Sequence, residues 1–289
     1  MAALHKYRSA FLALSLVTAC APMWSGPALA QGAAPADAAA GSGPTYADLA
    51  DLADSSPLVV RVQIRKLVRV EDERAPGLMA GHARYYVEAR TVALLAGGSA
   101  VGESLTYLVD LRLDERGKPP ALKKQEVVLF ARPVPGRPGE LQLTRPSAQL
   151  AWSEPLEARL RAVLSALLSP DAPARVTGVR EMLHVPGTLA GQGETQIFLK
   201  TANGSAASIT VRHEPGAPPV WGASFSELVA DVGRPPERDT LIWYRLACFL
   251  PNSPPPGANL SDSYADKRQA DADYRMVLGE LGVCERRLN

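Results

Sequence analysis

Alternation of apolar and polar residues along residues 57–144 constrains the fold more than any other feature of this chain. In the first run, every second side chain is apolar, which places one set of residues on the same face of an extended chain: Leu58, Val60, Val62, Ile64, Val68 and Val70. The other face carries Arg61, Gln63, Arg65 and Arg69. This period of two predicts a long strand with one buried face. Lys66 interrupts the apolar face, and we expect a β-bulge or bend there.

Four more strand-like runs follow at residues 83–95, 104–111, 125–131 and 140–144, separated by segments rich in proline and glycine. Five strands are too few for a β-sandwich and predict a small closed barrel over residues 45–150. The phrases LVVRVQIRKLVRV, YYVEARTVALLAGG and VVLFARP resemble OB-type barrels and, more loosely, the netrin-like variety of secreted proteins. The resemblance covers residues 57–144. Netrin-like barrels usually carry an N-terminal cysteine network, which this segment lacks, so the resemblance implies a barrel without an inhibitor role.

Residues 151–170 predict a bridging helix, because Ser153 can cap it, Pro155 fits its first turn and leucines form one stripe. Residues 171–289 predict a smaller α+β domain. Its sheet contains a hairpin at Asn203-Gly204, a pair that tolerates positive φ at both central turn positions. Two helices follow, within residues 239–251 and 262–282. The predicted fold class is therefore α+β: a five-stranded OB-like barrel, a helix, and an antiparallel hairpin sheet with two C-terminal helices.

The first thirty residues have the features of an export signal. Two basic residues precede a short apolar run, and small residues end at Ala30, so we expect cleavage between Ala30 and Gln31. Residues 31–44 are then a flexible leader rich in Ala, Gly and Pro. The alternative is a lipobox, in which Cys20 receives a lipid. The predicted location is the periplasm or the secreted fraction, and a membrane is involved only if Cys20 is lipidated.

Two cysteines remain downstream of the export signal, Cys248 and Cys284. An even number of cysteines in an exported chain predicts a disulfide between them. This bond requires the two C-terminal helices to cross, or the second to turn back after a long loop. The alternative is a buried Cys248 and a free thiol at Cys284.

Motifs for chemistry are weak in this sequence. The histidines after residue 30 are isolated and lack metal-ligand spacing: His82, His184 and His213. We therefore expect no metal and no cofactor. Gly222-Ala223-Ser224-Phe225-Ser226 approaches the G-x-S-x-G pattern but lacks its second glycine. One alternative is a periplasmic hydrolase whose catalytic residues meet only in the fold, with Ser224, His213 and Glu227 as the candidates.

Binding surfaces are the other class of hypothesis. The basic face of the first strand, with Tyr85, Tyr86 and Tyr107 nearby, has the composition of a nucleic-acid surface. Removal of residues 1–30 leaves 29 basic and 30 acidic residues, a formal charge of −1, and export separates the protein from nucleic acid, so none is expected as a partner. Aromatic residues gather in the second half, where a core is favoured over a ligand groove: Trp221, Phe225, Trp243, Tyr244 and Phe249.

The stretches GETQIFLKTANG, VWGASFSELV and DTLIWYRLACFLP are similar to exported bacterial proteins of unknown function from the sphingomonad group. That resemblance implies export but no activity. The main interpretation is a non-catalytic envelope protein that binds a partner protein or another envelope component. The Asn203-Gly204 hairpin and the barrel strands are its expected docking elements. Two alternatives stay open, the hydrolase and a barrel-type protease inhibitor.

Overall fold

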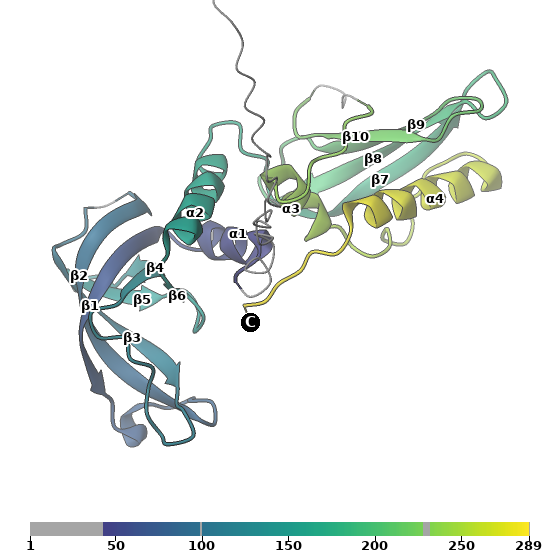
Figure 1. Ribbon diagram of the computed structural model, residues 1–289. Helices are drawn as coiled ribbons and strands as arrows, with labels where there is room; N and C mark the ends of the chain where they lie inside the picture. Colours follow the sequence, from purple (N-terminus) through teal and green to yellow (C-terminus); the bar gives the residue numbers. More distant parts are fainter. Residues whose placement is uncertain (1–42, 99, 228–231, 289) are drawn as a thin grey trace, which may run out of the picture. The chain divides into compact units, whose positions relative to one another are not determined.

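The computed structural model in Figure 1 describes residues 43–98, 100–227 and 232–288. The predicted signal segment, its cleavage site between Ala30 and Gln31, the alternative lipid site Cys20 and residues 31–42 of the leader lie outside the described residues. The described chain confirms the α+β class and the order of its parts. A short helix at Tyr46–Asp54 precedes the barrel, a second helix follows it, and an antiparallel sheet with two C-terminal helices completes the fold.

The barrel is built from six strand segments: β1 (Leu58–Arg69), β2 (His82–Gly97), β3 (Ser104–Arg112), β4 (Glu126–Pro133), β5 (Glu140–Leu143) and β6 (Gln149–Ala151). The strand order β1-β2-β3-β5-β4 closes through pairing of β1 with β4. The β3–β5 pair is parallel and the remaining pairs are antiparallel. Segment β6 pairs with β4 after the interruption at Arg145-Pro146, so β5 and β6 act as one broken fifth strand. This is an OB-like barrel.

The predicted bulge in the first strand is confirmed, and it changes which side chains enter the barrel. The register with β2 shifts between Ile64 and Lys66. One extra residue reverses the alternation, because successive side chains point to opposite faces. Leu67 therefore packs against the barrel core. Val68 is 43% exposed, and its predicted place on the buried face was wrong.

Residues 58–60 of β1 and 127–131 of β4 are buried on both faces, which explains why these parts of the two strands are uninterrupted apolar runs. Val60 and Leu129 point into the barrel core. Val59 and Phe130 point outward into a second hydrophobic core. Two helices contribute to that second core, α1 (Tyr46–Asp54) and α2 (Glu154–Leu167). Helix α2 begins after Ser153, whose side chain accepts a hydrogen bond from the backbone N–H of Leu156, as predicted.

Helix α1 was not predicted, although its start carries a recognisable signal. Thr45 and Asp48 form a reciprocal capping box, and Thr-x-x-Asp is the sequence signature of such a box. Three aspartates spaced three residues apart then face other parts of the chain. Asp48 accepts hydrogen bonds from the backbone N–H groups of residues 287 and 288. Asp51 accepts one from the Tyr244 hydroxyl at 2.6 Å, and Asp54 forms a bidentate pair with Arg245 at 2.9 and 3.1 Å.

The second sheet has the order β10-β9-β8-β7 and is antiparallel throughout. Its strands are β7 (Val176–Pro186), β8 (Gly193–Thr201), β9 (Ser208–His213) and β10 (Val220–Ser224). Helices α3 (Leu241–Ala247) and α4 (Tyr264–Leu281) follow, with α4 packed along β7 and β8 (Figure 1). The predicted hairpin exists, but its turn differs from the prediction. Gly204 has φ of 77°, Asn203 does not have positive φ, and the loop between the strands runs from 202 to 207.

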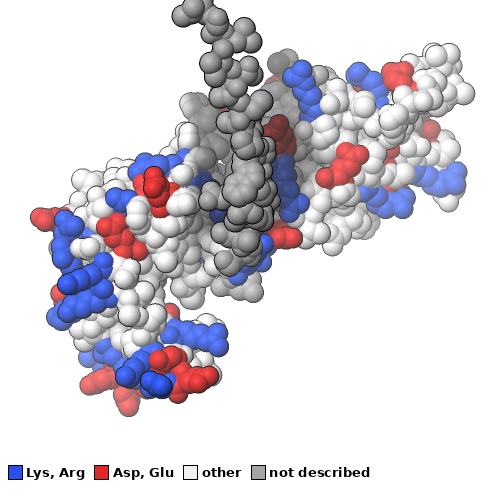
Figure 2. All heavy atoms as spheres, in the orientation of Figure 1, with Lys and Arg blue, Asp and Glu red and all other residues white. Residues whose placement is uncertain are grey.

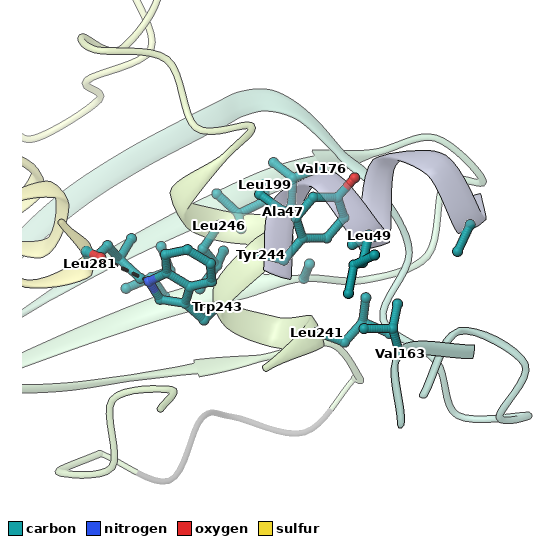
Figure 3. Packing of buried hydrophobic residues seen from close by; sticks show 14 of the residues in the cluster. Ala47, Leu49, Val163, Val176, Leu199, Leu241, Trp243, Tyr244, Leu246 and Leu281 are labelled. Atoms are coloured by element: carbon teal, nitrogen blue, oxygen red, sulfur yellow. Dashed lines mark hydrogen bonds between the residues drawn. The ribbon is translucent and has the colours of Figure 1, made fainter. Parts of the chain in front are cut away.

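The aromatic residues of the second half form a core, as favoured. Trp221 is 2% exposed and Tyr244 is fully buried. The indole N–H of Trp243 donates to the backbone oxygen of Leu281 at 2.8 Å (Figure 3). Side chains from α1, α2, β7, β8 and α3 surround these rings, so this core draws on segments from both halves of the chain.

The predicted disulfide joins Cys248 and Cys284. Residues 249–263 form the long loop that the pairing requires. This loop runs along the free edge of β7, where Met182 bridges Asn259. Helix α4 then returns toward the end of α3, and the two cysteines follow the C-terminal ends of these helices.

Candidate functional site

The structure does not bring together the residues of the hydrolase alternative. Ser224 lies opposite Ser208 at one end of the β9–β10 pair, and His213 ends β9 at the other. The two ends lie five positions apart along β9, about 16 Å at about 3.3 Å per residue. The hydroxyl of Ser224 lies 3.1 Å from that of Ser226, and Glu227 follows on the same exposed segment. A Ser–His–acid relay cannot form over this distance, so this assembly of the site is wrong.

His213 belongs instead to a buried polar cluster between the second sheet and α4. Its Nε2 lies 2.9 Å from Oδ1 of Asp273, a helix residue that is almost completely buried. The Thr195 hydroxyl on β8 donates a short hydrogen bond to the same carboxylate. His184 on β7 donates from Nδ1 to Thr195 Oγ1 at 2.8 Å, and Gln269 donates to Asp273 at 2.9 Å. We call these five residues the Asp273 cluster.

The geometry of the Asp273 cluster indicates a structural role. Thr195 is fully buried and its hydroxyl is engaged on both sides, so it cannot act as a nucleophile on an outside substrate. Burial lowers the pKa of His184, and the opposing effect of Asp273 does not restore it. Within the described residues, no group of three or more His, Cys, Asp or Glu side chains is arranged to hold a metal ion. The cluster therefore attaches α4 to three strands of the sheet.

The sequence contains one signal for this cluster. Asp273 lies on the apolar stripe of α4, three residues after Ala270 and four before Val277. A carboxylate on a buried stripe requires partners, because an unpaired buried charge is costly. Those partners come from three different strands, and single-chain spacing does not reveal them.

Most cations on the basic face of the first strand are paired with neighbouring acids. Arg61 contacts Glu157 at 2.9 Å and stacks on the Trp152 ring. Lys66 pairs with Glu88 at 3.1 Å, and basic and acidic side chains lie next to one another over the barrel (Figure 2). Tyr85 and Tyr107 are buried inside the barrel, where they cannot stack on a base. Of the three tyrosines, Tyr86 is the exposed one, at 38%.

An open seam in the barrel forms the best candidate binding site. Strands β3 and β5 pair at two positions, Thr106 with Glu140 and Tyr107 with Leu141, and then separate. The space beyond this point is a groove of about 720 Å³, which we call the seam groove. It is lined by residues of β2, β3, β5 and the Arg145-Pro146 interruption. The volume lies in the range of ligand-binding clefts.

Part of the β3 backbone beside the seam groove is unsatisfied. Thr106 donates its N–H to Gly139 on the β5 side, whereas Leu113 donates to Gly81 on the β2 side. Backbone groups alternate between the two sides of a strand, so those of Asp110 face the groove, and those of Arg112 point to the same side just beyond the residues that line it. Within the described residues, neither of these two has a backbone hydrogen-bond partner on that side. The seam is thus a short free strand edge.

The side chains beside this edge combine apolar surface with one available cation. Tyr86 and Leu108 lie opposite each other on β2 and β3, and Leu108 is 50% exposed. Arg84 is held by Asp110 at 2.7 Å, and Arg137 by Glu140 at 3.2 Å. Arg145 also lines the groove and, among the described residues, has no carboxylate within 4 Å.

No helix in the described part of the chain is both long and apolar enough to cross a membrane. Comparison with known proteins gives no functional assignment: no protein-family model matches the chain, and no curated protein does.

Proposed function

We propose that this is an exported, non-catalytic binding protein whose ligand surface is the seam groove of the barrel. The observation that carries the proposal is the free β3 edge next to the exposed Tyr86–Leu108 pair, in a groove of about 720 Å³. OB-like barrels commonly bind ligands on this side of the barrel, around strands 2 and 3. The Cys248–Cys284 disulfide supports an oxidising compartment, in agreement with the expected export signal.

Nothing in the described residues favours catalysis over binding. The one cluster of histidine and carboxylate is buried and occupied in holding α4, and Ser224 is far from it. The proposed compartment is the periplasm or the secreted fraction, with a membrane tether if Cys20 is lipidated. Intact mass of the protein from its host separates these forms, because a chain that begins at Gln31 and a chain lipidated at Cys20 differ in mass.

Site-specific photo-crosslinking in the host envelope tests the proposed surface. A photoreactive residue at position 108 samples the seam groove, and one at position 94 samples an exposed leucine that does not line it. We expect a discrete adduct from position 108 that is absent from position 94 and is lost when Tyr86→Asn is combined with the probe. Equal labelling at both positions, or no adduct at position 108, would contradict a binding role for the groove.

A further inference from the structure

We infer that the ligand of the seam groove is an extended peptide segment of another protein, which pairs with β3 as an added strand and carries an apolar residue near a carboxylate. This inference rests on the proposed function and adds the chemical class and the binding mode of the partner. It follows from three properties of the groove: the free backbone edge, the apolar pair and the charge.

The free edge selects a ligand that has its own backbone. The N–H and C=O groups of Asp110 face the groove, and those of Arg112 continue the same free edge just beyond its lining residues, whereas those of Val109 and Leu111 face β2. A peptide strand satisfies such groups at alternate residues, as in β-augmentation. A lipid or a sugar does not offer donors and acceptors at the strand repeat. The edge is short, so backbone pairing by itself gives little affinity and side chains must contribute.

The apolar pair supplies a contact for one side chain of the peptide. Tyr86 and Leu108 occupy directly opposed positions on adjacent strands, with 38% and 50% of their surfaces exposed. Residues in such positions touch the same neighbour across the sheet surface. The Arg84–Asp110 ion pair occupies the next outward-facing cross-strand position after Tyr86 and Leu108 and marks one end of this apolar surface.

The charge of the groove selects against nucleic acid and in favour of a carboxylate. The ion pairs of Arg84 and Arg137 are internal to the groove, which leaves Arg145 as its available cation. A single arginine matches one carboxylate. A nucleic-acid strand would require a series of cations and stacking platforms, and Tyr86 is the exposed aromatic residue there.

Selection from a library of linear peptides on phage tests this inference with the full, oxidised chain. We expect enriched peptides that share an apolar residue and an acidic residue. Leu108→Asn and Arg145→Glu should each weaken binding of a selected synthetic peptide at least about tenfold. Two matched controls, Leu94→Asn and Arg116→Glu, change an exposed leucine and an exposed arginine outside the groove and should leave binding within about twofold.

Backbone measurements distinguish strand addition from simple adhesion. In the free protein, the amides of Asp110 and Arg112 should exchange faster than those of Val109 and Leu111, and peptide binding should slow both. N-methylation of alternate peptide residues should weaken binding about tenfold, and methylation of the residues between them should have a small effect. Binding without protection of Asp110 and Arg112 overturns the inference.

The crosslinking result distinguishes failure of the proposed binding surface from failure of the peptide-strand inference. If position 108 gives its specific adduct but no selected peptide binds the groove, the binding surface stands and the peptide-strand inference is overturned. If position 108 gives no adduct and no peptide binds, both the proposed function and the inference are wrong.

Discussion

Removal of the Asp273 carboxylate tests whether the polar cluster attaches α4 to the sheet. Asp273 is 2% exposed and accepts hydrogen bonds from Thr195, His213 and Gln269. Asp273→Ala leaves these donors without their acceptor, and Thr195 is fully buried, so water cannot replace it there. We therefore expect a large loss of stability from a change of one small side chain.

The magnitude follows from the number and burial of the groups left behind. Each buried polar group without a partner costs about 1–3 kcal/mol, and removing one partner of a buried ionic network costs about 3–5 kcal/mol. Gln269 and His213 are nearer the surface and recover part of their loss by hydration. We expect Asp273→Ala to lower the free energy of unfolding by about 3–4 kcal/mol, a large part of the about 5–15 kcal/mol typical of a domain.

Urea unfolding at pH 7.5 and 25 °C, followed by circular dichroism, measures this difference. Asp271→Ala is the matched control, because Asp271 is an exposed aspartate on the same helix that accepts one hydrogen bond, from Asn259. The control should lose less than about 1 kcal/mol. If Asp273→Ala and Asp271→Ala unfold within 1 kcal/mol of each other with unchanged m values, the cluster does not hold α4 and the reasoning is refuted.

Three further predictions concern stability. Cys248→Ser and Cys284→Ser should each cost about 4 kcal/mol, because the bond closes a long loop, and the double variant should cost no more than either; additive losses in urea unfolding would contradict the bond. Burial lowers the pKa of His184 in the folded state, so the folded protein favours the neutral imidazole. The stability that depends on this neutral form is complete above about pH 6.5 and is lost as pH falls below that value. Unfolding midpoints from pH 7.5 to 5.5 should therefore decline less in His184→Gln than in the unchanged protein. Asp54→Ala leaves the buried guanidinium of Arg245 without its carboxylate and should lower the free energy of unfolding by about 3 kcal/mol. Asp72→Ala breaks an exposed ion pair and should lower it by less than about 1 kcal/mol. Similar unfolding midpoints for the two variants would reject a stabilising role for the buried pair.

The barrel was predictable because its information is local. Alternating residues and proline-glycine turns specify strands one at a time, and five such strands admit few closed arrangements. The bulge at Ile64–Lys66 was also visible, as a charge on an apolar face. The exposure of Val68 was not deduced. The bulge reverses which side chains face the barrel interior, and this is seen only when the pairing with the neighbouring strand is known.

Helix α1 shows the opposite case, in which a short local signal was overlooked and its importance depends on distant residues. The capping box at Thr45 marks the start of the helix. Its aspartates are meaningful because Tyr244, Arg245 and the C-terminal residues approach them from nearly two hundred or more positions away. Such contacts fix the packing of the second core, and the spacing of the aspartates does not reveal which distant residues they meet.

By itself, the sequence determined most of the elements, with α1 and β6 as exceptions, and also their order, the disulfide partners and the composition of the aromatic core. Hydrophobic periodicity and capping act within a few residues, and parity of cysteines in an exported chain requires no coordinates. Tertiary structure decided that His213 meets Asp273 and not Ser224, and that β3 leaves β5 after two residue pairs. Both are juxtapositions of separate segments, set by the register of strands and by the packing of a helix. A binding groove is also formed by segments that are separate in the sequence. The seam groove could therefore be recognised only from the tertiary structure of the barrel.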